Sequence, residues 1–241
     1  MVASERKQRE LEERELRIID AARGMLAKEG YLGLNMDRVA TQVEYSKGTI
    51  YNHFATKEDL LLAVVNDAKE KRVALFERAA AFNGTPRERM YAIGVADTIF
   101  SRLHDDSFEI EHLLRTHSVW EKTSAERQEA LGCSDDRCLE LCLGIVHDAV
   151  AGGDLVTTPE RAQMYMHALH TMSLGTHELA QDEMMSSKYD LIEPYQALRN
   201  NLTIFLDAIH WKPLSNVWDY EQTYERIAKE VFPDEYPRVF E

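Results

Sequence analysis

The sequence predicts an all-α protein. Three observations lead to this fold class. Apolar residues recur at the helical spacings i, i+3, i+4 and i+7 through nearly the whole chain, the alternating pattern of β-strands is scarce, and Gly and Pro fall at the boundaries between apolar segments. With 241 residues, 44% of them hydrophobic, the chain is long enough for one or two domains with a substantial core.

Composition excludes several classes of protein. No segment approaches the ~20 consecutive apolar residues that a transmembrane helix needs. The first segment, MVASERKQRELEERELR, is highly charged and lacks the apolar centre of a signal peptide, so we expect a soluble cytoplasmic protein without a membrane partner. The three cysteines, Cys133, Cys138 and Cys142, show no disulfide-like spacing and are expected to be reduced.

The charge is distributed unevenly along the chain. The net charge is −14, yet residues 1–57 hold 10 Lys and Arg against 9 Asp and Glu, whereas residues 58–241 hold 18 against 33. Only the N-terminal part could therefore meet a polyanion without strong repulsion.

The N-terminal region begins with a charged arm, residues 1–16, which is expected to be either an exposed helical extension or a mobile segment. The first amphipathic helix follows, and Gly30 is expected to close it in a left-handed conformation. Its buried face comprises Ile18, Ala21, Ala22, Met25 and Leu26.

Two short helices come next. Asn35 is a suitable N-cap for a helix over residues 36–43, and Ser46 for a helix over residues 47–53 that is anchored by Ile50 and Phe54. Thr56 opens a capping pattern for a longer helix that continues to about residue 82.

The rest of the chain is predicted to be helical as well. Thr85 and Pro86 form an N-cap and first-turn pair that restarts the chain after the NGTP boundary. We expect the tail after residue 231 to be irregular, and helices over residues 86–104, 108–117, 124–131, 135–151, 159–183, 191–211 and 219–231.

The two short helices, joined by a tight turn and braced by a flanking helix, form a helix-turn-helix unit whose second helix could enter the major groove of DNA. With Ile50 and Phe54 facing the core, the other directions of this helix carry Lys47, Thr49, Tyr51, Asn52 and His53. Such side chains donate to phosphate or read base edges, and Gly48 lets the backbone approach the duplex. The alternative is an ordinary solvated surface on a helical bundle.

The residues Arg17–Val65, RIIDAARGMLAKEGYLGLNMDRVATQVEYSKGTIYNHFATKEDLLLAVV, closely resemble the DNA-binding domain of the tetracycline-repressor-like (TetR) family. The order SKGT, IY, HF and TKE is the most specific part. The resemblance implies a DNA-binding domain over residues 17–63. It also implies a ligand-binding and dimerisation domain over residues 83–241. The role of the C-terminal extension after Trp211 stays open at this point, with closing the pocket and padding the dimer as the alternatives.

Carried over by position, the resemblance implies a ligand-responsive transcriptional regulator, most often a repressor, that binds a palindromic DNA operator as a homodimer and is released by a small molecule. The residues expected at the DNA are Arg38, Ser46, Lys47, Gly48, Thr49, Tyr51, Asn52, His53 and Lys57. Lys57 would hold a phosphate at the start of its helix.

The sensing half is less specific in sequence. An amphipathic organic effector would suit a pocket of apolar, aromatic and a few polar groups, with core packing as the alternative role: Phe100, Leu103, His104, His112, Leu113, Trp120, Cys142, Ile145, Tyr165 and His170. The dimer surface is expected on two C-terminal helices, at apolar positions that could equally be internal core: Met164, Ala168, Met172, Leu198, Leu202, Phe205 and Ile209.

A second function class stays open at this point. His167 with His170 and Cys138 with Cys142 have helical spacings that could bring two ligands to one metal ion, so a helical metal- or small-molecule-binding protein without a DNA-regulatory role is the alternative. No HExxH or paired CxxC motif supports a metal site, and none is predicted, nor is any cofactor. No catalytic motif is present, so we expect no enzyme.

Overall fold

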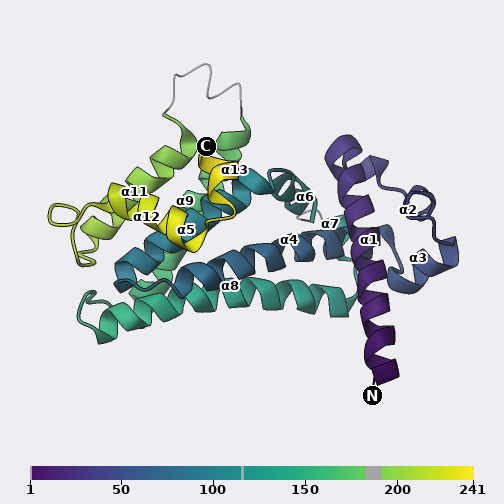
Figure 1. The fold of residues 1–241 in the computed structure, drawn as a ribbon, viewed down its shortest axis with the longest axis horizontal. Coiled ribbons are helices and arrows are strands. Elements are labelled where there is room, and N and C mark those ends of the chain that lie inside the picture. The colour runs from purple at the N-terminus through teal and green to yellow at the C-terminus, as the bar shows by residue number, and fades with distance from the viewer. Residues whose placement is uncertain (1, 115–116, 183–191) are drawn as a thin grey trace. The chain divides into compact units, whose positions relative to one another are not determined.

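The computed structural model describes residues 2–114, 117–182 and 192–241, and every regular element in these ranges is a helix (Figure 1). The all-α prediction is confirmed. The helices are α1 Val2–Gly33, α2 Met36–Gln42, α3 Lys47–His53, α4 Lys57–Ala80, α5 Pro86–Leu103, α6 Asp106–Leu114, α7 His117–Trp120, α8 Ala125–Ala151, α9 Pro159–Gln181, α11 Pro194–Ala208, α12 Tyr220–Val231 and α13 Tyr236–Phe240.

The chain forms two compact units. We call residues 1–70 and 104–135 the N-terminal unit, and residues 71–103 and 136–241 the C-terminal unit. Residues 104–135, which the sequence assigned to the ligand-binding half, therefore belong to the same unit as the helix-turn-helix. None of the helices in the described ranges is both long and apolar enough to span a bilayer.

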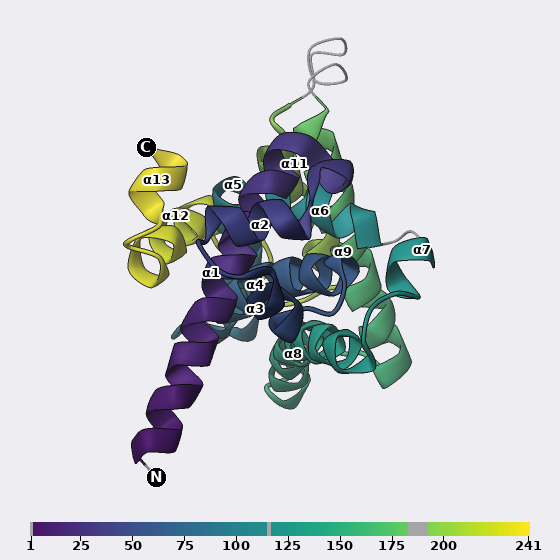
Figure 2. The same cartoon turned by 90° about the vertical axis from the view of Figure 1, so that its right-hand side faces the viewer.

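In the N-terminal unit, the charged arm is the beginning of α1, which starts at Val2 (Figure 2). The predicted inner face of this helix is buried, with Ile18 and Ala22 fully inaccessible. Gly30 has the positive φ expected of it, 64°, but its ψ of −169° lies outside the left-handed helical region, and helical turns continue to Gly33.

Local capping residues set the helix starts elsewhere. The hydroxyl of Thr56 accepts a hydrogen bond from the Asp59 amide at 3.0 Å, as predicted for the start of α4. At the start of α5, the Thr85 amide donates to the Glu88 carboxylate at 2.9 Å, and the Glu88 amide donates back to the Thr85 hydroxyl at 3.3 Å. This reciprocal pair satisfies two amides that the helix itself leaves unpaired.

Two sequence expectations are wrong. The helices expected over residues 124–131 and 135–151 are one helix, α8, because Gly132 alone does not break a helix and Ser134 satisfies its hydroxyl by donating to Asn66 Oδ1 at 2.9 Å and Glu70 Oε1 at 2.6 Å. The tail expected to be irregular contains α13, where Pro237 occupies the first turn.

In the C-terminal unit, α12 and α13 pack on α5, and α11 packs between α5 and α9 (Figure 1). Arg87 of α5 is fully buried and ties the region after α11 to this core. Its guanidinium donates to the Thr203 carbonyl at 3.3 Å, pairs with Asp207 at 2.7 Å and stacks on the Tyr220 ring at 4.4 Å. The extension after Trp211 is thus an integral part of the C-terminal unit.

Candidate nucleic-acid interface

The helix-turn-helix is built by two side-chain caps. Asn35 Oδ1 accepts hydrogen bonds from the amides of Asp37 at 2.9 Å and Arg38 at 3.2 Å, which starts α2. Ser46 Oγ accepts from the Thr49 amide at 3.1 Å, which starts α3. Because a helix of seven residues is unstable alone, these caps and the underlying core hold α3 in place.

Burial divides α3 into two faces. Ile50 is 0% and Phe54 1% exposed, and both belong to the core that α1 and α4 share. Among the residues predicted to contact DNA, six are exposed and three, Thr49, His53 and Lys57, are partly buried. The exposed ones are Arg38, Ser46, Lys47, Gly48, Tyr51 and Asn52. Six of the nine predicted residues are thus exposed on α2, on α3 or at the Ser46 cap between them.

The cations on this face have internal partners. Both Nη atoms of Arg38 donate to the Glu29 carboxylate, at 2.7 and 2.6 Å, and Lys47 Nζ donates to Asp37 Oδ2 at 2.5 Å. Hydrogen bonding to Arg38 lowers the pKa of Glu29 from its ordinary value. The charges of Arg38 and Lys47 are therefore each balanced by a carboxylate.

Two of the predicted positions face other protein groups. His53 Nδ1 lies 3.6 Å from Glu15 Oε2. The Lys57 ammonium lies 3.9 Å above the ring of Tyr31, whose hydroxyl donates to Glu58 at 2.7 Å. Burial and this hydrogen bond raise the pKa of Tyr31 to about 12, so the ring stays neutral and attractive to the cation.

The sequence did not predict the contacts that Arg127 makes at the C-terminal end of α3. Arg127 of α8 pairs with Glu15 at 2.8 Å, lies 4.8 Å from the centre of the Phe54 ring, and donates a long hydrogen bond to the His53 carbonyl at 3.5 Å. Arg127 lies more than seventy positions from α3 in the sequence, and no local pattern marks such a pair.

The predicted effector-pocket residues divide between the units. His104, His112, Leu113 and Trp120 lie in the N-terminal unit, and the other six lie in the C-terminal unit. In the latter, Phe100 and Ile145 are buried core residues, His170 is exposed, and the remaining three are partly buried: Leu103, Cys142 and Tyr165.

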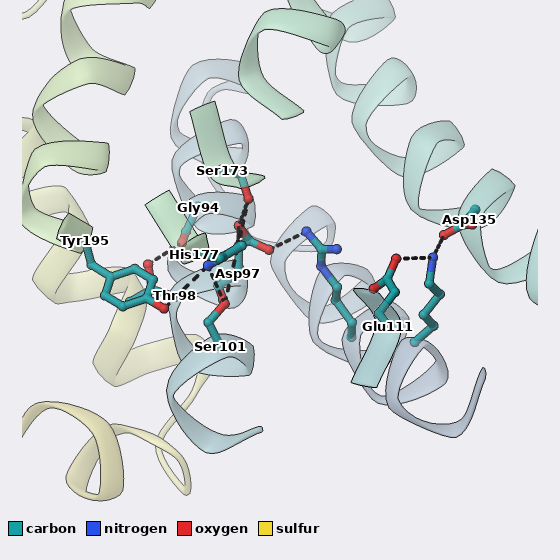
Figure 3. Close-up of polar contacts among 11 residues, drawn as sticks. Gly94, Asp97, Thr98, Ser101, Glu111, Asp135, Ser173, His177 and Tyr195 are labelled. Atoms are coloured by element: carbon teal, nitrogen blue, oxygen red, sulfur yellow. Dashed lines mark hydrogen bonds and ion pairs between the residues drawn. The ribbon is translucent and has the colours of Figure 1, made fainter. Parts of the chain in front are cut away.

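The C-terminal unit contains a buried polar cluster that the sequence did not reveal (Figure 3). Asp97 of α5 accepts from Arg72 at 2.5 Å and from the Ser173 hydroxyl, and it lies 3.2 Å from His177 Nε2. Ser101 Oγ is 3.0 Å from the other ring nitrogen of His177. The four elements α4, α5, α9 and α11 meet here, because Tyr195 of α11 also approaches His177 at 3.4 Å.

The cluster fixes charge inside an apolar core. Burial disfavours ionisation of Asp97, but the Arg72 guanidinium and the contact with His177 outweigh burial and hold the pKa of Asp97 below its ordinary range. Burial also raises the pKa of the nearby Cys142 to about 12, so this thiol is protonated and unreactive.

An open hollow of about 410 Å³ lies elsewhere on the C-terminal unit and is lined by none of the predicted effector residues. Its charged lining is largely paired: Arg89 with Asp148 at 2.5 Å, and Arg137 with Glu77 at 2.7 Å. Among the described side chains, no three of His, Cys, Asp or Glu lie close enough together to hold a metal ion.

Comparison with known proteins agrees with a helix-turn-helix in the N-terminal unit. Residues 18–64 match the family model described as "Bacterial regulatory proteins, tetR family". The chain is 36% identical over 78 residues to the HTH-type transcriptional repressor KstR of Mycolicibacterium smegmatis, an alignment that covers 32% of this chain and 38% of the relative. It is 33% identical over 134 residues to the repressor AcnR of Corynebacterium diphtheriae, covering 54% and 64%.

These two alignments span less than two thirds of either relative. The whole fold has a wider match, to the solved structure of a TetR/AcrR-family transcriptional regulator from Thermobifida fusca YX-ER1. That comparison gives a TM-score of 0.63 at 22% sequence identity and covers 81% of this chain and 97% of the other. At this identity the likeness concerns the fold alone.

Proposed function

Because the chain belongs to the TetR family of bacterial regulatory proteins, we propose that it is a dimeric transcriptional repressor that places α3 in the major groove of an operator and is released by a small molecule. The family consists of transcriptional regulators rather than enzymes.

The observation that carries the proposal is that α3 has one buried face and one exposed face. Ile50 and Phe54 fix one face in the core, while Lys47, Tyr51 and Asn52 extend from the other with no core role. A rigid helix with donors on its free face is the arrangement that reads base edges and phosphates. Asn52 suits recognition of adenine, and Tyr51 and Lys47 suit phosphate.

Dimerisation would place two copies of α3 on the two halves of a palindrome. Support comes from α9 and α11, which pack together and expose large apolar side chains. Met164 is 68% and Ile204 66% exposed, and Leu179 is also exposed. Leu202, which was considered for this surface, is buried inside the unit, whereas Met164 is available. An exposed apolar surface of this kind suits a two-fold dimer.

The effector would bind in the C-terminal unit and change the affinity of the N-terminal unit for DNA by favouring one of two states. A pocket that combines apolar groups such as Phe100 with a few polar ones suits an amphipathic organic molecule. The buried cluster around Asp97 adds polar groups to the region where Phe100 and Cys142 lie.

The direct test is selection from a random duplex pool with the purified protein, followed by measurement of affinity against salt. The proposal predicts a palindromic motif and an affinity that falls steeply as salt rises, since each phosphate contact contributes a slope of about −0.9 in log K against log salt. No enriched motif from folded dimer, before or after refolding free of small molecules, would contradict it. Purification with a bound metal ion and no duplex affinity would favour the alternative, a metal-binding protein.

A further inference from the structure

The cations of the surface proposed to meet DNA are held in contacts with the protein itself. Its three permanent cations each have an internal partner: Arg38 holds Glu29, Lys47 holds Asp37, and Lys57 lies over the ring of Tyr31. Two of these partners are carboxylates, the same chemical class of acceptor as a phosphate oxygen.

The two carboxylates belong to the helix-turn-helix region. Glu29 lies near the end of α1, and Asp37 lies in the first turn of α2, next to Arg38. Both pairs are open to water. The side chains of Arg38 and Glu29 are 52% and 42% exposed, and those of Lys47 and Asp37 are 68% and 52% exposed.

The exposure of these two ion pairs determines how much they contribute to stability and to DNA binding. Exposed ion pairs contribute little to folding, so stability is a weak reason for their presence. They do change the electrostatic potential that an approaching duplex meets at the protein surface. A cation that stays paired with a carboxylate does not neutralise a phosphate and therefore releases none of the counterions condensed on the duplex, and the carboxylate repels a phosphate that comes close.

We propose that Glu29 and Asp37 compete with DNA phosphates for Arg38 and Lys47 and so keep the affinity for arbitrary DNA low. An arbitrary duplex gains little at these two cations, because each phosphate contact must displace a carboxylate. A duplex with the right sequence offsets this cost through base contacts along α3. The inference rests on the proposed function and adds to it a reason why binding to non-operator DNA stays weak.

A carboxylate could instead orient its cation for binding DNA, and this role predicts the opposite change in affinity. If the bidentate contact with Glu29 served to orient Arg38 for a phosphate or base, removal of the carboxylate would weaken operator binding. Competition predicts stronger binding. The sign of one affinity change therefore separates the two roles.

The experiment uses the full-length protein with Glu29→Gln, Asp37→Asn and the double substitution. Glu225→Gln, on the exposed side of α12 in the C-terminal unit, is the matched control because it changes the net charge equally without touching the DNA-facing surface. Affinity is measured for the selected operator and for an unrelated duplex of equal length, over a series of salt concentrations. Thermal unfolding checks that each variant is folded.

Each carboxylate removed should steepen the slope of log K against log salt by about 0.9, which near 0.1 M salt is an affinity increase of about eight-fold for the unrelated duplex. The operator complex pays the same displacement cost, so its affinity should rise by a similar factor and the ratio of specific to non-specific affinity should change little. The Glu225→Gln control should leave the slope unchanged.

Unchanged slopes in folded Glu29→Gln and Asp37→Asn variants, or weaker binding to both duplexes, would overturn the inference. An effect of equal size in Glu225→Gln would do the same, because it would reduce the result to net charge. If the wild-type protein bound no duplex at all, the proposed function itself would fail, and that outcome is visible before any variant is made.

Discussion

Replacement of Asp97 by Asn should destabilise the C-terminal unit by breaking a buried ion pair. The carboxylate is 2.5 Å from Arg72, and the two side chains are only 5% and 16% exposed. Removing one partner of a buried pair typically costs ~3–5 kcal/mol, because the other charge is left without compensation. Arg72 keeps some contact with water, which favours the lower end, about 3 kcal/mol. For a chain of this length that corresponds to a fall in Tm of about 6–12 °C.

The assay is thermal unfolding followed by circular dichroism at pH 7, with Asp148→Asn as the control. Asp148 also pairs with an arginine, Arg89, but its side chain is 58% exposed, so its loss should cost no more than ~1 kcal/mol. A Tm for Asp97→Asn within about 2 °C of wild type would refute the reasoning, since the pair would then contribute nothing net.

The pH dependence of this difference follows from the lowered pKa of Asp97. A carboxylate whose pKa is lower in the folded than in the unfolded state stabilises the protein above its unfolded value, about 3.9, and loses that effect as the pH falls through the folded value. The gap in Tm between wild type and Asp97→Asn should therefore be present at pH 7 and should shrink as the pH falls below about 4.

Three further predictions concern the helix-turn-helix. Ser46→Ala removes the cap of α3 and should cost about 1 kcal/mol in unfolding free energy while weakening operator binding, as measured by denaturation and titration; Ser46→Asp, which can still cap, should keep the stability. Ile50→Ala should cost ~2–5 kcal/mol because the side chain is fully buried, and unchanged denaturation would contradict its core position. Asn52→Ala should alter the motif recovered by selection more than the overall affinity, and an identical motif would exclude base reading by Asn52.

Much of the helix-turn-helix could be predicted because its determinants are local. Asn35, Ser46 and Thr56 cap helices with amides two or three residues away, so each start is readable from a short segment. Ile50 and Phe54 are apolar residues four positions apart on one face, which indicates the buried side directly.

The rest could not be predicted because its determinants join distant parts of the chain. Arg127 meets Glu15 and Phe54 only after folding, and Asp97 meets His177 across eighty positions. A sequence pattern reports which residues share a helical face, but not which charged residue lies opposite. The same limit explains α8: the sequence predicted two helices over residues 124–131 and 135–151, whereas the hydrogen bond of the Ser134 hydroxyl to Glu70 of α4 favours one continuous helix.

Tyr51→Ala tests whether the free face of α3 contacts DNA. Tyr51 is 51% exposed, so its removal leaves the core intact, and any loss of binding reports on the contact itself. The account predicts an affinity for the selected operator at least about ten-fold weaker, ~1.4 kcal/mol, with an unchanged Tm. Tyr236→Ala, in the C-terminal unit, should bind like wild type. Full operator affinity in a folded Tyr51→Ala protein would contradict the placement of α3 in the groove.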